Sequence, residues 1–577
     1  MISEGATPDG LRDSPGVKRP AAIRSWRLPL ALLLLLQVLS YARMAGPEFL
    51  FSIHNHDDTE SYLALGRALS LDLGYTRSLD PAFYVPHRHF PPVLPALIAS
   101  IFRFSDSMLG PQLLIMAFAL ANTLLLYVLA RRFVRPSLAL LTTAWTVLSP
   151  LYGTLAVVVM AEQPLVFFTL ISVLALDRWT RAGWHWDRWA LLAAGAMAVG
   201  VLVKGILLAA APALLAFALL GSGPWSVRRR RLLRASGLVV LALLPWLAWG
   251  ARCLVTPAIG YEGLLHMEEI ETGRMSAEHA RGLVERLILM RRILTGSVPY
   301  RAADIFGGAG WMLQTYSSHP LGLLPRAALL LFLAGLLARS LRNFGTTGLA
   351  GLIAAATIGL LLTFHAGGAA RYWLSVLPIL TLLLMAQVEG WLLRRKNRGS
   401  PTRGVMIASF VAALTTVGGL FLLEQLQRRP QFGGPWADFV QSGQELRRRS
   451  DATAVVLGHN LLALQLISRR YAALSEDDWR GLKNETAMRR QVFVVEPDPR
   501  SEVRRPVTIG WPGNFLGDQG SSLTPADLPG EKLEIWRNGS YRILQLRPAE
   551  VPAPDGNGGL RLDSQGSIRS SVRARPN

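Results

Sequence analysis

Long apolar runs separated by short polar connections fill the first three quarters of the chain, and this pattern predicts membrane-spanning helices. A helix that crosses the apolar core of a bilayer needs roughly 17–25 apolar residues. Eleven runs come near that length: residues 28–50, 111–130, 137–155, 162–177, 189–203, 205–221, 235–254, 327–341, 347–364, 372–391 and 405–423. The first run lacks a small-residue cleavage site, so we expect it to be kept as a span.

The pattern changes after residue 424, where short segments of helical and strand character alternate. Helical segments are expected at residues 436–449 and 460–468, and strands at 452–458 and 491–497. We therefore predict an α-helical polytopic membrane domain over residues 28–423, followed by a small α/β domain over 424–550. Residues 551–577, rich in Pro, Gly, Ser and Arg, are expected to be disordered.

The composition agrees with a membrane protein. Of the 577 residues, 51% are hydrophobic and 17% are charged, and the mean hydropathy is +0.31. Soluble domains carry about 25% charged residues. Cys253 is the single cysteine, which excludes an intramolecular disulfide and a four-cysteine zinc site.

The net charge of +21 is concentrated in the membrane part. From Glu424 onward the chain has 22 Lys or Arg and 18 Asp or Glu, a net charge of +4, which leaves +17 for the rest. That excess lies in arginine clusters on alternate connections: Arg24 and Arg27, Arg131 and Arg132, Arg178 and Arg181, Arg228 to Arg231, Arg339 and Arg342, and Arg394 and Arg395. This is the positive-inside pattern, so we expect membrane lipids and no nucleic acid as partners.

The same rule predicts the topology. Residues 1–27 are expected in the cytoplasm, whereas two long loops, about 51–110 and 255–326, and the C-terminal domain lie on the outer side. Long loops between spans are often functional.

The first outer loop begins with two adjacent carboxylates, Asp57 and Asp58. A helix is expected over residues 58–70, with Asp58, Tyr62 and Leu65 on one stripe. Aspartate at a helix start can simply cap the N–H groups and complement the dipole. A pair at a membrane exit favours a general base, or ligands for a divalent metal.

The loop then continues as "YVPHRHFPPVLPALIA", residues 84–99. His87, Arg88 and His89 precede a rigid proline turn. These side chains could form an aromatic and basic interface belt, or a pocket that binds the phosphate or the sugar of a substrate.

Three ionisable residues lie near span ends, where charge is costly unless it faces a cavity or a partner. Glu162 could pair with a basic group or take part in catalysis. Lys204 could extend to the interface, or bind an anionic lipid phosphate. Arg371 opposes the positive-inside trend, and its guanidinium suits phosphate.

Together these motifs resemble the GT-C membrane glycosyltransferases, in particular the bacterial relatives of protein O-mannosyltransferases and the lipid A aminoarabinose transferase. The matching stretches are "HDDTESYLALGRALSLDLGY", "PHRHFPPVLPALIA", "AEQPLVFFTL", "LVKGILLAAAPALL" and "AARYWLSVLPIL". The resemblance covers about residues 25–423. Val93 replaces the usual glycine of the proline turn, and Phe90 the usual tyrosine.

The resemblance implies transfer of a sugar from a polyprenyl phosphate, with inversion, to a lipid, protein or polysaccharide acceptor. Arg371, Lys204 and Arg88 would bind the phosphate. Asp57 or Asp58 would be the base, and Asp58 fits the family spacing to Tyr62 better. The other aspartate and Glu162 would hold a divalent metal or position the acceptor.

Two other functions remain open from the residues alone: a lipid-linked sugar transporter or flippase, and a non-catalytic scaffold. Transporters often show repeated halves and charges near mid-span, and neither is evident in this sequence. The resemblance also implies the bacterial cytoplasmic membrane as the location, with the C-terminal domain in the periplasm.

Overall fold

The computed structural model describes the following residues: 27–45, 56–77, 79, 87, 90–255, 323–342, 346–364, 370–396, 435–451, 454–458, 461–469, 471–472, 492–497, 531–538 and 541–547. The chain divides into two compact units, Met1–Ala437 and Asp438–Asn577, and each is described by itself.

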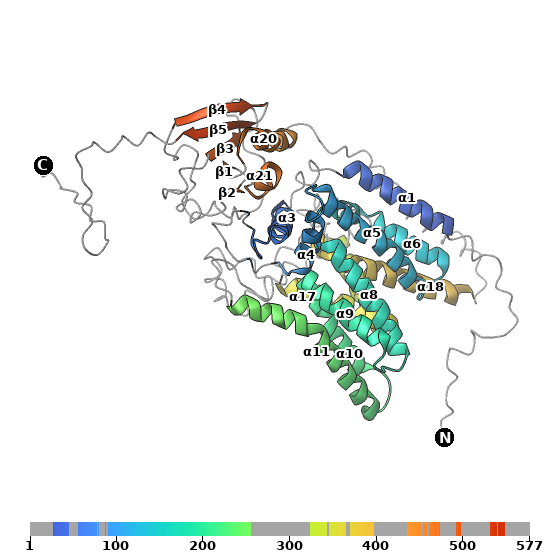
Figure 1. The fold of residues 1–577 in the computed structure, drawn as a ribbon. Helices are drawn as coiled ribbons and strands as arrows, with labels where there is room; N and C mark the ends of the chain where they lie inside the picture. Colours follow the sequence, from blue (N-terminus) through green and yellow to red (C-terminus); the bar gives the residue numbers. More distant parts are fainter. Residues whose placement is uncertain are drawn as a thin grey trace, which may run out of the picture. The chain divides into compact units, whose positions relative to one another are not determined.

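The first unit is built from helices (Figure 1). They are α1 (Arg27–Met44), α3 (His56–Ser70), α4 (Val93–Phe102), α5 (Leu109–Ala130), α6 (Pro136–Val147), α7 (Pro150–Leu155), α8 (Glu162–Arg181), α9 (Arg188–Val203), η3 (Gly205–Ala209), α10 (Ala210–Leu220), α11 (Trp225–Val255), α16 (Leu323–Arg342), α17 (Thr346–Phe364), η7 (Ala370–Ser375) and α18 (Leu377–Lys396).

Helices are found in the first ten predicted spans, from 28–50 to 372–391. They differ in length and in apolar composition, which decide whether a helix can cross a membrane. Within the described ranges, three are long and apolar enough by length and composition: Arg27–Met44, Leu109–Ala130 and Trp225–Cys253. Other apolar helices are shorter, and the predicted span 405–423 lies outside the described residues. The count of eleven therefore stays a prediction.

One predicted span is interrupted, and the boundary between two others is found where it was predicted. Residues 137–155 divide into α6 and α7, because Pro150 holds Ser149 in an extended conformation and the Ser149 hydroxyl accepts the N–H of Tyr152 at 3.3 Å. The boundary between the predicted spans 189–203 and 205–221 coincides with Lys204, whose backbone is extended (φ −160°, ψ 128°) between α9 and η3. The break leaves this lysine at the end of α9 instead of inside a longer helix.

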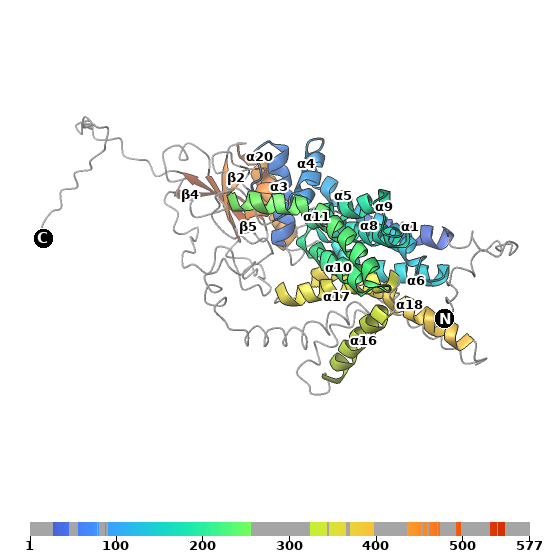
Figure 2. The same ribbon diagram turned by 90° about the horizontal axis from the view of Figure 1, so that it is seen from below.

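Helix α8 lies in the middle of the bundle. It packs on α5 and α9, and α9 in turn packs on α11. Helix α10 packs between α11 and α17, and α18 packs on α6. Helix α16 lies at the edge of the bundle, against α17 and α18 (Figure 2). A Cβ atom at Gly200 of α9 would clash with Leu207 and Phe168, so this glycine allows α9, η3 and α8 to approach closely.

The helix predicted in the first outer loop is present as α3, but it is not one-sided. Besides Tyr62 and Leu65 of the predicted stripe, residues on other sides of the helix are buried, including Glu60, Leu63 and Ala64. Helix α4 covers one face, where Ile98 lies against Gly66 without room for a Cβ atom. Tertiary packing therefore covers this helix beyond the stripe that the sequence pattern marks.

The second unit contains a five-stranded sheet in the order β2-β1-β3-β5-β4. Its elements are α20 (Pro435–Arg449, which begins in the first unit), β1 (Val455–Gly458), α21 (Leu461–Ser468), β2 (Tyr471–Ala472), β3 (Val492–Pro497), β4 (Glu531–Arg537) and β5 (Tyr541–Arg547). Strands β2, β1 and β3 are parallel, and β5 is antiparallel to β3 and β4. Phe439 of α20 stacks edge-on against Tyr541 of β5.

Candidate active site

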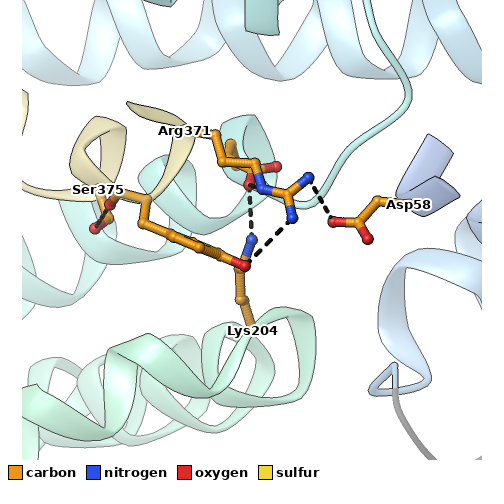
Figure 3. Close-up of polar contacts among 6 residues, drawn as sticks. Asp58, Lys204, Arg371 and Ser375 are labelled. Carbon is orange, nitrogen blue, oxygen red and sulfur yellow. Dashed lines mark hydrogen bonds and ion pairs between the residues drawn. The ribbon is translucent and has the colours of Figure 1, made fainter. Parts of the chain in front are cut away.

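Four charged side chains from four separate helical segments meet in the first unit (Figure 3). Asp58 comes from the first turn of α3, Glu162 from the first residue of α8, Lys204 from the residue after α9, and Arg371 from η7. All four are among the charged residues that the sequence singled out in the first outer loop and at the span ends. The fold brings them into one row of alternating charge.

One end of the row is a buried ion pair between Glu162 and Lys204. The Lys204 ammonium donates to Oε1 of Glu162 at 2.6 Å, and the residues are 4% and 2% exposed, respectively. Lys204 therefore does not extend to the interface as an isolated cation. Glu162 gains further stabilisation from its position at the N-terminus of α8, where the helix dipole favours negative charge.

The other end is an ion pair between Arg371 and Asp58. Nη1 of Arg371 lies 2.9 Å from Oδ2 of Asp58, and the aspartate side chain is 14% exposed, more than the other three. Nε of Arg371 lies 4.0 Å from Oε1 of Glu162, which links the two pairs. Asp58 is thus the one carboxylate of the row that solvent reaches to an appreciable extent.

Arg371 has one hydrogen-bond donor without a partner among the described residues. Its Nε is buried and makes no hydrogen bond within the described residues. A buried donor without a partner costs free energy of about 1–3 kcal/mol. An oxygen atom of an incoming anion would satisfy it.

Tyr372 was not assigned a role from the sequence, yet it contacts both cations. The Lys204 ammonium lies 4.4 Å from the centre of its ring, and its hydroxyl accepts a hydrogen bond from Nη2 of Arg371 at 3.3 Å. The signal for this residue was present in the Arg-Tyr dipeptide of "AARYWLSVLPIL", from which only the arginine was interpreted.

Tyr62 lies close to the carboxylates. Burial, and then the charges of Asp58 and Glu162, raise the pKa of the Tyr62 hydroxyl far above its ordinary value, so the phenol stays neutral. Its ring packs 4.5 Å from that of Phe90, measured between centroids. Tyr62 therefore connects the row of charges to the proline turn.

His87 supports that turn. Its backbone N–H donates to the carbonyl of Tyr75 at 2.7 Å, and its Nε2 accepts the N–H of Phe90 at 3.2 Å. Contact of His87 with a phosphate or a sugar stays a prediction. The other predicted residues of this motif, Arg88 and His89, lie outside the described residues.

The predicted metal ligands were Asp57, Asp58 and Glu162. The backbone of Asp57 is in the first turn of α3, but its side chain is outside the described part of the structure. Asp58 and Glu162 are each paired with a cation, and no group of three His, Cys, Asp or Glu side chains comes together among the described residues. The described donor set does not fit a metal ion, and metal binding stays a prediction.

Comparisons with known proteins bear on the family and the fold of the chain. Residues 89–249 match the family model described as dolichyl-phosphate-mannose-protein mannosyltransferase. The crystal structure of ArnT from Cupriavidus metallidurans bound to undecaprenyl phosphate is similar, with a TM-score of 0.50 and 14% identity over 90% of this chain and 97% of that one. A comparison of the sequence with curated proteins finds no match.

A second similar fold is the oligosaccharyltransferase from Archaeoglobus fulgidus. Its apo structure has a TM-score of 0.52 and 14% identity, with 82% of this chain and 69% of that one covered. Its complex with Zn and sulfate has a TM-score of 0.51 and 15% identity, with 81% and 68% covered. At these identities the likeness establishes a common fold.

Proposed function

From its relationship to the GT-C glycosyltransferases of the protein mannosyltransferase and ArnT type, we propose that this multi-pass membrane protein transfers a sugar from a polyprenyl-phosphate donor to an acceptor. The observation that carries the proposal is the row Asp58–Arg371–Glu162–Lys204. It combines a partly accessible carboxylate with two buried cations, as a base and an anion-binding site require.

The cations suit the phosphate of the donor. Arg371 offers the buried Nε that has no hydrogen-bond partner within the described residues, and Lys204 contacts the Glu162 oxygen that lies near this Nε. Cations that neutralise charge developing on a leaving phosphate lower the barrier to its departure. Because Glu162 is 2% exposed and bound to Lys204, it acts as a positioning residue whose negative charge holds the two cations near one another.

Asp58 is the base in this mechanism. Its carboxylate takes the proton from an acceptor hydroxyl or amine, the acceptor atom forms a bond to the anomeric carbon, and the bond from that carbon to the phosphate oxygen breaks. Polyprenyl phosphate leaves with the bonding electrons. Attack from the face opposite the phosphate inverts the anomeric configuration. The ion pair with Arg371 orients the Asp58 carboxylate.

The proposal includes the location. We place the protein in a bacterial cytoplasmic membrane, with its N-terminus in the cytoplasm and residues 424–550 in the periplasm. The arginine-rich connections support this orientation. Reporter fusions after residue 57 and at residue 424 test it, and a cytoplasmic location of either one contradicts it.

The test of function uses the full chain in liposomes with a panel of polyprenyl-phosphate sugars labelled in the sugar. We expect labelled sugar to reach an acceptor fraction and polyprenyl phosphate to be released. The Asp58→Asn variant should lower kcat by about 10²–10⁴-fold, the usual contribution of a general base. The exposed Arg448→Gln variant serves as a control and should retain turnover.

Three outcomes would overturn the proposal. Transfer that survives Asp58→Asn combined with Asp57→Asn excludes the carboxylate pair as the base. Movement of labelled lipid between leaflets without transfer of sugar indicates a flippase. A complete lack of both activities for every donor in the panel indicates a scaffold.

A further inference from the structure

A second cationic site lies at the opposite end of α8. The helix starts at Glu162 of the active site and runs to Arg181, and at about 1.5 Å per residue its Arg178 lies roughly 24 Å from Glu162. This distance approaches the thickness of the apolar core of a bilayer. The groups at this end therefore belong to the other membrane boundary, away from the proposed sugar transfer.

Two arginines at this boundary converge on a single indole ring. The guanidinium carbon of Arg178 lies 5.7 Å from the ring centre of Trp189, and that of Arg188 lies 5.3 Å from it. Both arginines are exposed, whereas Trp189 is half-buried. The ring holds the two guanidinium groups close together, and they repel one another. An anion bound between them would reduce this repulsion.

The nearby carboxylates are already engaged. Asp177 accepts from Arg132 at 2.7 Å and from Arg181 at 3.1 Å. Asp187 caps α9 by accepting the N–H groups of the residues at positions 189 and 190. Within the described ranges, neither Arg178 nor Arg188 forms an ion pair, so the two charges are available to a ligand.

An apolar stripe continues from this pair of cations along α9. Leu191 and Leu192 are 62% and 45% exposed, and Gly195 follows at the next turn with nothing within 4 Å of a Cβ atom placed there. With Arg188 these positions follow i, i+3, i+4 and i+7, which is one face of a helix. In a membrane protein such a face contacts acyl chains, directly below the two guanidinium groups.

The two arginines suit a phosphate group, and the adjacent apolar face suits an acyl chain. A phospholipid carries both groups in one molecule. We propose that Arg178, Arg188 and Trp189 bind the headgroup of an anionic phospholipid, and that the stripe of Leu191, Leu192 and Gly195 holds one of its acyl chains. Arginine suits the phosphodiester because its planar fork makes paired hydrogen bonds. The site is independent of the proposed transferase activity.

The experiment is a titration of the purified, delipidated full chain in detergent with phosphatidylglycerol or phosphatidylcholine, followed by native mass spectrometry. Phosphatidylglycerol should bind the unchanged protein at least tenfold more tightly than phosphatidylcholine. The double variant Arg178→Gln/Arg188→Gln should bind phosphatidylglycerol about thirtyfold more weakly, as expected for two arginines near an anionic headgroup.

The matched control is Arg229→Gln/Arg230→Gln, which removes two exposed charges from α11 and should leave the affinity within twofold. Equal weakening by both double variants would show non-specific attraction and overturn the proposal. Displacement of the lipid by millimolar inorganic phosphate would also overturn it, because the site would then take free phosphate. Each variant should keep the thermal midpoint of the unchanged protein when it is measured without lipid, because all four substituted arginines are exposed.

Discussion

Replacing Lys204 by Met tests the buried ion pair directly. The substitution keeps the length of the side chain and removes the charge, which leaves Glu162, 2% exposed, without its partner at 2.6 Å. Breaking a buried pair from one side costs about 3–5 kcal/mol, because the remaining charge is uncompensated. Arg371, with its Nε 4.0 Å from the same carboxylate oxygen, compensates in part. We therefore expect a loss of about 3 kcal/mol in the free energy of unfolding.

The double variant Lys204→Met/Glu162→Gln tests whether the loss of stability comes from the unpaired charge of Glu162. With both charges gone, no unpaired ion is buried, and most of the lost free energy should return. The measurement is denaturant unfolding of the donor-free protein in detergent micelles, followed by tryptophan fluorescence. The Arg448–Glu445 pair provides a control because its arginine is exposed, and Arg448→Gln should cost less than about 1 kcal/mol. A double variant no more stable than Lys204→Met would refute the reasoning.

Three further predictions concern other parts of the structure. Tyr372→Phe, which keeps the ring over the lysine ammonium, should change donor KM less than threefold, whereas Tyr372→Leu should raise it about tenfold or more in steady-state assays; equal effects would exclude the ring. Gly200→Ala should lower the free energy of unfolding by about 1–3 kcal/mol, because the added methyl group would clash with Leu207 and Phe168. Gly195→Ala, on the same helix but next to open space, should raise it by about 0.5–1 kcal/mol. Similar shifts in the two variants, measured by denaturant unfolding, would contradict the packing of α9. Burial raises the pKa of Tyr541 to about 12, so the stability of the folded state should be retained below pH 10 and fall as the pH rises from 10 through 12; a Tyr541→Phe variant with the same alkaline decline would show that another group is responsible.

The local pattern of the sequence was enough to locate most elements. Apolar runs of helical length correspond to helices, and α8 starts at Glu162, the residue at which the predicted span begins. In the tail, the segments predicted at 436–449 and 491–497 agree with α20 and β3 within one residue at either end. These features depend on residues that are neighbours in the chain, so periodicity and turn residues report them.

The sequence predicted which residues belong to the candidate site, but it did not predict how they pair with one another. Asp58, Glu162, Lys204 and Arg371 each attracted attention because a charge at a membrane boundary is costly without a reason. That Arg371 would face Asp58 and that Lys204 would bind Glu162 could not be read from the sequence, because each pair joins distant segments. Tyr372 was overlooked, since an aromatic residue at a span start has an ordinary explanation at the interface.

The sequence by itself determined where most helices and the strands β1 and β3 form, and which charges are out of place in a membrane protein. The tertiary structure decided which charges neutralise one another, and it buried α3 beyond the stripe that the pattern marked. The physical reason is range. Backbone hydrogen bonds and helical periodicity act over a few residues, whereas the partner of a buried charge is chosen by packing between helices far apart in the chain.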